Sequence, residues 1–339
     1  MFIIRPAALN DLDALEKFAF SVSLGMISLP RDRNLLLKKI EHSIESFDQE
    51  ITVPKNEAYW FVLENTKTGE VVGSTGIKAK SGVKEPLYFF RIEVQHPQSS
   101  AMPVPDEIRI LHPISLSNGP SELCALYLAP EWRSKGIGEL LSLSRFLFIA
   151  GHPHRFENII MAVLRGFISK SRKTSPFWEG LGRHFLNLEL HEIYSMLEQG
   201  RSFIPDFLPK YPIYVSLLTK QAQYVIGKPH ISTRPALKML KKQGFKATQD
   251  IDILEAGPVI SAQKNEIRTI KGSVLATVEG RTQKAIHSKR YVISNNNIDF
   301  RACCDTLEIS GEHKVLLTEE VMKALKVNTG DKIRYAKTY

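Results

Sequence analysis

The sequence has few cysteines, no long hydrophobic run and no leader-like beginning. Its three cysteines, Cys124, Cys303 and Cys304, are too few for a disulfide framework and lack the spacing of a zinc site. We expect the adjacent pair to be reduced strand residues, as in the cytoplasm. No apolar run has the roughly 20 residues that a membrane helix needs, and no basic stretch precedes an apolar one at the N-terminus. The sequence therefore predicts a cytoplasmic protein without a metal and without a membrane segment.

Acidic residues are outnumbered, with 36 Asp and Glu against 45 Lys and Arg, which gives a net charge of +9. A basic balance can indicate nucleic-acid binding. Here, however, the basic residues are scattered, and clusters such as 170–173 and 238–242 are short. This distribution argues against a nucleic-acid partner and fits a polyanionic small molecule. With 339 residues, 43% of them hydrophobic, the chain is long enough for two or three domains.

The most informative stretch is residues 122–141, which read ELCALYLAPEWRSKGIGELL. Residues 123–128 are an apolar run that predicts a strand, and Ala129-Pro130 ends it. A mostly apolar helix is predicted over 139–150, so a short basic turn with two glycines lies between the strand and the helix. Such a junction is typical of an anion-binding site, because the helix N-terminus adds positive potential.

This turn predicts a cradle for a phosphate group. Arg133, Gly136 and Gly138 occur in the order R-x-x-G-x-G, and glycines let the backbone approach an anion closely. We expect the phosphate to lie on backbone amides of the turn, those of Lys135, Gly136, Ile137 and Gly138. The side chains of Arg133 and Lys135 would add charge. The alternative is an ordinary glycine-containing junction between a strand and a helix.

The rest of the pattern predicts a mixed α/β fold, in which a mixed central sheet is flanked by helices. The predicted elements are a strand at 2–5, helices from residue 12 and at 35–47, a hairpin at 58–64 and 70–77, a strand at 88–95 and a buried strand at 158–164. The segment between residue 96 and Pro120 is rich in proline and serine, and we expect a loop there.

Two similar junctions suggest an internal repeat. SPFWEGLGRHF at 175–185 and RPALKMLKKQGF at 234–245 both predict a short helix, a glycine and a following apolar residue. They indicate two similar half-domains, although helix–glycine–strand junctions are common. After residue 260 short strands prevail. We therefore expect three parts: residues 1–190, a helix-rich second half at 191–260 and a small β-rich module at 261–339.

Several runs occur together in one order along the whole chain: VVGSTGI, SELCALYLAPEWR, SRFLFIA, FWEGLGRHF, FLPKYPIY, VIGKPH and IDILEAGP. With these runs the chain resembles GNAT-type acyl-CoA N-acyltransferases and, more closely, the arginine N-succinyltransferase family. The resemblance implies a GNAT-like fold and transfer of succinyl from succinyl-CoA to the α-amine of L-arginine in arginine catabolism. The amine attacks the thioester directly in this superfamily. The strand-rich C-terminal part is then either an interface of a homo- or hetero-oligomer or a buttress.

The resemblance also implies roles for individual residues. The main chain of Leu126 contacts succinyl-CoA, and His230, in VIGKPH, is the catalytic proton donor. An imidazole titrates near neutral pH and can protonate the departing thiolate of CoA. Many members of the superfamily use a tyrosine in the region of FWEGLGRHF, where this chain has Phe177 and Trp178, neither of which has a hydroxyl. This difference favours His230 as the acid.

Three acidic residues and one cysteine complete the candidates. Glu122 opens the central strand, where it is a base, an anchor for the cationic substrate or a member of a surface ion pair. Asp252 and Glu255 are weaker candidates for binding a guanidinium, which needs paired carboxylate acceptors. Cys124 is expected to be a buried strand residue, because direct attack needs no thiol.

One position departs from the family pattern. Val163 stands in MAVLRG, where a glutamate is expected two residues before Arg165. If that glutamate helps to bind arginine, the chain is less active with arginine or prefers another amine. One alternative is therefore a related acyltransferase with a different amine or another acyl-CoA. A second alternative is a CoA-binding module without catalytic activity, which predicts no thiol release with any substrate.

Overall fold

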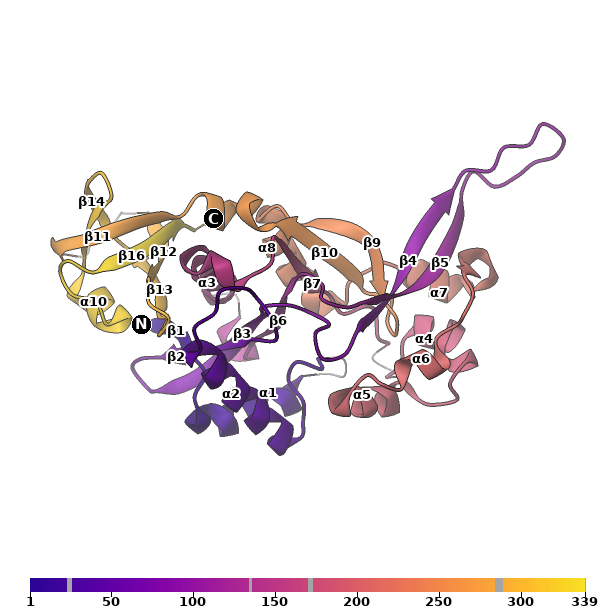
Figure 1. The fold of residues 1–339 in the computed structure, drawn as a ribbon, viewed down its shortest axis with the longest axis horizontal. Helices are drawn as coiled ribbons and strands as arrows, with labels where there is room; N and C mark the ends of the chain where they lie inside the picture. The colour runs from indigo at the N-terminus through magenta and orange to yellow at the C-terminus, as the bar shows by residue number, and fades with distance from the viewer. Residues whose placement is uncertain (23–25, 134–135, 170–172, 284–288, 339) are drawn as a thin grey trace.

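The computed structural model describes residues 1–338 except 23–25, 134–135, 170–172 and 284–288. Within this part, one mixed sheet of 16 strands runs through the molecule (Figure 1). Its order is β14-β15-β11-β16-β12-β13-β1-β2-β3-β6-β7-β10-β9-β4-β5-β8. Helices lie on both sides of this sheet, so the mixed α/β class expected from the sequence is confirmed.

The N-terminal elements follow the predicted order. They are β1 (Phe2–Pro6), α1 (Leu12–Ser21), α2 (Arg33–Asp48), β2 (Ala58–Asn65) and β3 (Glu70–Lys78). Asp32 is the N-cap of α2, and its side chain accepts a hydrogen bond of 2.9 Å from the amide of Leu35. α1 and α2 cover one face of β2 and β3 through an apolar cluster that includes Leu15, Leu36 and Trp60.

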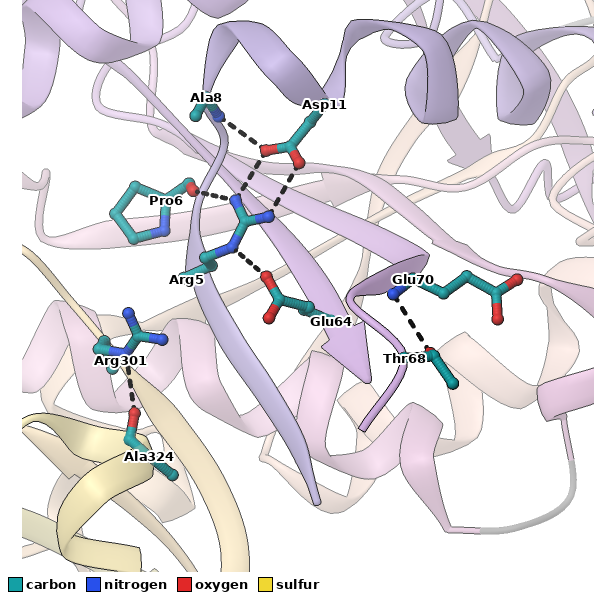
Figure 2. A network of polar contacts seen from close by, with 9 residues as sticks. All are labelled: Arg5, Pro6, Ala8, Asp11, Glu64, Thr68, Glu70, Arg301 and Ala324. Carbon is teal, nitrogen blue, oxygen red and sulfur yellow. Dashed lines mark hydrogen bonds and ion pairs between the residues drawn. The ribbon is translucent and has the colours of Figure 1, made fainter. Parts of the chain in front are cut away.

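Arg5 fixes the path of the chain between β1 and α1, as Figure 2 shows. Its guanidinium makes two hydrogen bonds to the carboxylate of Asp11, at 2.7 and 2.9 Å, and a third of 2.6 Å to Glu64 of β2. The amide of Ala8 also donates to Asp11. Because the groups are partly buried and the Arg5–Asp11 contact is bidentate, this network stabilises the entry to α1 more than a surface ion pair would.

One prediction from the sequence is wrong. The segment 96–120, expected to be a loop, contains β5 (Ile108–Leu116), which pairs with β4 (Leu87–Gln95) along its whole length. Pro113 obscures the strand pattern. However, β5 pairs on its other side with β8 (Ile213–Tyr214) at two positions, so most of it is an edge where proline is tolerated. The two strands form an arm that projects from the body in Figure 1.

The middle of the sheet is built from β6 (Ser121–Leu128), β7 (Ile159–Val163), β10 (Pro258–Gln263) and β9 (Lys246–Asp252). The helix α3 (Ile137–Gly151) follows β6, and it contacts α8 (Arg234–Lys242) and α9 (Arg268–Lys271). Phe148 of α3 lies 5.1 Å from the ring of Phe61 and 5.2 Å from that of Phe300. These ring contacts hold α3 against the sheet, opposite α1 and α2.

A second apolar core lies toward the β4–β5 arm. It is formed by α4 (Pro176–Gly180), α5 (Leu190–Gln199), α6 (Ile204–Phe207) and α7 (Lys220–Val225) together with strand residues. Phe177 and Trp178 are fully buried in this core, where Phe177 packs edge-on against Phe90 of β4. Both side chains therefore have a structural role.

The C-terminal elements have their own core around Val278, Ile293 and Val321. They are β11 (Val274–Arg281), β12 (Arg290–Asn295), β13 (Ala302–Thr306), β14 (Glu308–Gly311), β15 (Lys314–Leu317), α10 (Glu319–Leu325) and β16 (Lys332–Lys337). β13 pairs with β1, with Cys303 opposite Ile3, so the sheet continues into this part. The three cysteines are free thiols. In the part of the chain that the structure covers, none of the helices is both long and apolar enough to cross a membrane.

Candidate active site

β6 and β7 lie side by side only where they begin. The two strands are parallel and pair at two positions, Ser121 with Ile160 and Glu122 with Met161. Beyond Glu122, β6 has no pairing with β7, whereas β7 continues along β10 up to Val163. The two strands therefore open into a wedge. The β6 backbone groups that face it have no strand partner there. Side chains bond some β6 backbone groups, as Ser28 does the Ala125 amide and Arg133 the Leu128 carbonyl, and the others could bind an extended ligand.

A bulge interrupts β6 inside this wedge. The register with β3 shifts between Ser74 and Gly76, so that Ala125 and Leu126 lie together opposite one residue of β3. Ala125 has a positive φ of 51°, and the Ser74 hydroxyl donates to its carbonyl at 2.9 Å. Leu126 packs partly buried against the cluster around α3. The bulge changes the direction of the main chain at Leu126, and a non-glycine residue with positive φ leaves no mark in the sequence.

The glycine turn leads directly into α3. Gly136 is the N-cap of that helix, with a left-handed φ of 73°, and Ile137 is its first, buried residue. Gly138 is open on its outer side, because the nearest atom to an added Cβ is a Leu128 methyl at 3.8 Å. Arg133 is exposed, and its Nε donates to the carbonyl of Leu128 at 2.9 Å. Lys135, the remaining residue of the predicted cradle, lies outside the described residues.

Glu122 is half-buried at the point where the wedge begins. Its Oε2 accepts from Lys78 at 2.8 Å and from the hydroxyl of Ser81 at 3.2 Å, whereas Oε1 has no hydrogen bond to a described residue. Burial alone would raise the pKa of this carboxyl. The charge of Lys78, helped by Arg201, outweighs burial and holds the pKa below its usual value. Glu122 is therefore an ionised carboxylate with one oxygen available.

Cys124 lies two residues after Glu122 in β6, and it is half-buried. Burial raises the pKa of its thiol, although the charges of Lys78, Lys39 and Arg145 oppose this. A thiol with a raised pKa is a poor nucleophile at neutral pH. This environment fits the structural role that the sequence predicted for Cys124.

His230 comes from a loop far along the chain, between α7 and α8. Its amide donates to the carbonyl of Arg165 at 2.8 Å, which holds the loop beside the segment that follows β7. The ring Nδ1 accepts from the amide of Ser232 at 3.2 Å and lies 2.7 Å from its hydroxyl. Because Nδ1 accepts a hydrogen from the backbone, the neutral ring carries its own hydrogen on Nε2. The fold thus brings His230 next to the end of β7.

A buried polar cluster joins the end of β7 to α5. The hydroxyl of Tyr194 donates to Glu255, and the guanidinium of Arg165 lies 4.0 Å from the same carboxylate. Burial raises the pKa of Glu255 to about 7, although the charge of Arg165 opposes the shift. Asp252 accepts two backbone hydrogen bonds, and burial raises its pKa too. Both carboxylates therefore have protein partners already.

Comparisons with known proteins decide the family. The family model described as arginine N-succinyltransferase beta subunit matches residues 2–269, and the model of its C-terminal domain matches residues 274–337. The chain belongs to the arginine N-succinyltransferase family. The arginine N-succinyltransferase of Escherichia coli strain 55989 is 35% identical to it over 98% of this chain and 97% of the relative. That of Enterobacter sp. strain 638 is 36% identical over the same shares.

A solved structure agrees with this assignment. The arginine/ornithine succinyltransferase subunit AI from Pseudomonas aeruginosa superposes with a TM-score of 0.89 at 32% identity, over 99% of this chain and 98% of that one. As a member of the arginine N-succinyltransferase family, the chain is a transferase with the acyltransferase fold that the sequence predicted. Among the described residues no three His, Cys, Asp or Glu side chains gather as a metal ion would require.

The sequence analysis did not single out several charged residues that lie around the wedge. Lys39 and Lys78 belong to elements that look like solvated surface in the sequence, and Arg165 is one basic residue among many. Arg145 did carry a signal, because it stands in the apolar run LLSLSRFLFIA of α3. A charged residue inside a helix that is apolar all round is rarely buried without a reason.

Proposed function

We propose that this chain transfers a succinyl group from succinyl-CoA to the α-amine of L-arginine by direct attack of the amine on the thioester. The observation that carries the proposal is the wedge between β6 and β7 immediately ahead of a helix that begins at a left-handed glycine. In a member of the arginine N-succinyltransferase family, the wedge would hold an extended acyl-CoA, and the start of α3 would bind its phosphate groups.

The donor would lie along β6. The pyrophosphate of CoA would rest on the amides at the start of α3, around Gly136, Ile137 and Gly138, where the helix dipole favours negative charge. Arg133 and Lys135 would add positive charge at the surface. The pantetheine arm would hydrogen-bond the backbone groups of β6 that have no β7 partner, and the thioester would meet the main chain of Leu126 at the bulge.

The acceptor would bind beside Glu122. Glu122 is ionised and has a carboxylate oxygen free of described hydrogen bonds. A carboxylate with a lowered pKa is a weak base but a good partner for a cation. Its role would therefore be to anchor the cationic amino acid near the thioester rather than to remove the proton. Asp252 and Glu255 are less suited to this role, because burial raises the pKa of both carboxyls and so disfavours the charged form that binds a cation.

His230 would assist the leaving group. Its backbone is tied to Arg165 next to the end of β7, and its Nδ1 accepts from Ser232, so that Nε2–H is the hydrogen it can donate. Donation from Nε2 to the sulfur would stabilise the CoA thiolate as the C–S bond breaks. The α-ammonium group would lose one proton to solvent before the attack. The proton that the nitrogen loses as the amide forms would pass to the CoA thiolate, so the products would be N-succinylarginine and free CoA.

The test is release of free thiol from succinyl-CoA with L-arginine, L-ornithine and L-lysine as separate acceptors. We expect turnover with arginine and none without an amine. Absence of thiol release with every acceptor at millimolar concentration would refute the proposal. Mass spectrometry of the arginine reaction should show addition to the α-amine.

A second candidate differs in the acceptor. Val163 stands where the family pattern has glutamate, and in the structure it packs in an apolar cluster with Met161 and Val259. The Pseudomonas aeruginosa neighbour is named for both arginine and ornithine. The less acidic wall at Val163 favours a weaker preference for arginine over ornithine. Val163→Glu should then raise the ratio of arginine to ornithine turnover, and an unchanged ratio would remove Val163 from acceptor selection.

Assembly into an oligomer also belongs to the proposal. Both the family model and the Pseudomonas aeruginosa structure are described as subunits. The strand-rich C-terminal part would serve as an interface or as a buttress for β1. Sedimentation velocity of the full chain would distinguish a monomer from a larger assembly.

A further inference from the structure

Arg145 is a buried cation for which the described part of the chain provides no carboxylate. It is 2% exposed and lies in the middle of α3. Its two hydrogen bonds, each of 3.3 Å, go to the carbonyl and the hydroxyl of Ser142 one turn back in the same helix. Burial lowers the pKa of the guanidinium to about 10. A buried charge without a counter-ion is strongly destabilising, so its retention needs an explanation.

Three other cations, each buried or partly buried, are better satisfied. Arg5 pairs with two carboxylates. Arg155 donates to two backbone carbonyls and to the hydroxyl of Tyr59, at 2.8 to 3.2 Å. Lys264 donates to two carbonyls at 2.7 Å each. Arg145 stands apart from these groups because its bonds are long, local and neutral. Of these four cations, it is the one best prepared to receive an anion.

The surroundings of Arg145 also favour an anion. The helix α3 contacts β6, and the charge of Arg145 acts on Cys124, which lies two residues beyond the Glu122 pairing where the wedge opens. Lys39 and Lys78 act on the same thiol from the other side, and Glu122 is the one carboxylate among these groups. Glu122 is already paired with Lys78. Three cations against one anion leave the beginning of the wedge with a positive excess.

We propose that Arg145 binds the terminal carboxylate of a dicarboxylic acyl group and so makes the enzyme selective for succinyl-CoA over uncharged acyl-CoAs. The inference deepens the proposed function and rests on it for the position of the donor. With the thioester at Leu126, the acyl chain would run along β6 toward Cys124, and its carboxylate would meet the guanidinium in a bidentate contact.

An extended succinyl group would reach from Leu126 to about the position of Cys124. Two strand residues, from Leu126 to Cys124, cover about 7 Å. The three carbon–carbon bonds between the thioester carbon and the carboxylate carbon, about 1.5 Å each, span roughly 4 Å when extended. A charge-assisted hydrogen bond adds about 2.8 Å. A shorter or uncharged acyl group would leave the guanidinium buried without an anion, which is a penalty against the wrong donor.

The experiment compares succinyl-CoA with butyryl-CoA, in which a methyl group replaces the carboxylate. For wild type, Arg145→Gln and Arg145→Lys, kcat/KM is measured with each donor at saturating arginine. We expect Arg145→Gln to lower the succinyl-to-butyryl ratio about 100-fold or more, because a desolvated charge pair is lost. Arg145→Lys keeps the charge but loses the planar fork, and we expect a fall of about 10-fold.

The matched control is Arg155→Gln, which removes another buried guanidinium, one that the structure ties to backbone carbonyls and to Tyr59. It should lower the unfolding temperature without changing the donor ratio. If Arg145→Gln does not fold, Arg145→Lys decides the question. An unchanged ratio in the folded variant, or an increase in the KM for arginine with the donor ratio intact, would overturn the assignment.

Binding without an amine separates this inference from the proposed function. Calorimetry should show wild type binding succinyl-CoA at least 10-fold more tightly than butyryl-CoA, and Arg145→Gln binding the two about equally. If succinyl-CoA binds selectively but no arginine is succinylated, the proposed acceptor is wrong and the carboxylate site stands. If arginine is succinylated while both donors bind wild type equally, the carboxylate site is wrong and the function stands.

Discussion

The backbone amide of His230 donates to the carbonyl oxygen of Arg165 at 2.8 Å. This bond joins the loop before α8 to the segment that leaves β7, so His230 is tied to one of the two strands that form the wedge. The side chain of His230 is held as well, because Nδ1 accepts from Ser232. The imidazole is thus fixed in position before any substrate binds.

Replacement of His230 should abolish turnover without abolishing donor binding. We expect His230→Ala to lower kcat about 100-fold or more, in the range typical of a lost general acid, with the Kd for CoA changed less than about 3-fold. The same variant loses the N-cap contact to Ser232, so its free energy of unfolding should fall by about 1 kcal/mol. Thiol release and calorimetry with CoA measure the two effects separately.

His230→Asn is the matched control for that prediction. Asparagine can cap the same turn but cannot exchange a proton near neutral pH. We expect this variant to recover the lost stability and to remain as inactive as His230→Ala. Recovery of activity by asparagine would mean that His230 acts only through the fold of its loop.

Glu122→Gln should weaken acceptor binding rather than the chemical step. The lowered pKa of Glu122 keeps the carboxylate ionised throughout the neutral range, so it does not titrate there as a general base would. We expect the KM for arginine to rise about 10-fold, and the pH dependence of kcat between pH 6 and pH 9 to keep its shape. Loss of the acidic limb of that profile would instead identify Glu122 as the base. Steady-state kinetics across this pH range is the measurement.

The double variant Glu122→Gln, Lys78→Met separates binding from stability. Glu122→Gln alone leaves the Lys78 ammonium without its carboxylate and should lower the free energy of unfolding by roughly 1–3 kcal/mol. Removing both charges should restore much of that stability but leave the KM high. Restoration of a normal KM in the double variant would show that Glu122 only neutralises Lys78.

Sequence reasoning was most successful where the chemistry is local. The glycine turn, the strand before it and α3 follow from glycine, proline and apolar spacing within 20 residues, and the structure has them at Ser121–Leu128 and Ile137–Gly151. The wedge could not be predicted, because it depends on which strands pair and where they part. The bulge at Ala125 and the contact of His230 with Arg165 depend on residues distant in sequence in the same way. β5 was missed because Pro113 reads as a breaker unless the strand is known to be an edge.

The two glycines of the turn should behave differently. Gly136 has φ of 73°, so Gly136→Ala forces a side chain into the left-handed region and should lower the free energy of unfolding by about 1 kcal/mol. Gly138 has an ordinary backbone and space for a methyl group, so Gly138→Ala should leave stability nearly unchanged. If the pyrophosphate lies on these amides, Gly138→Ala should still weaken CoA binding. Urea unfolding measures the stability of both variants, and calorimetry measures their binding of CoA. An unchanged Kd for CoA in Gly138→Ala would show that the phosphate does not bind at this turn.

Glu255 should make the stability of the protein fall as pH rises toward neutrality. Burial raises its pKa from the ordinary 4.5 to about 7, so between these two values the folded state holds a proton that the unfolded state has released. The free energy of unfolding should therefore decrease across this window, by roughly 3 kcal/mol at most from this group. Glu255→Gln removes the titration, and its unfolding free energy should be flatter between pH 4.5 and pH 7 than that of wild type. Glu70→Gln, at an exposed position, is the control. The unfolding free energies are measured by urea unfolding at several pH values. If those of wild type and Glu255→Gln change equally between pH 4.5 and pH 7, Glu255 is ionised across this window and forms an ion pair with Arg165.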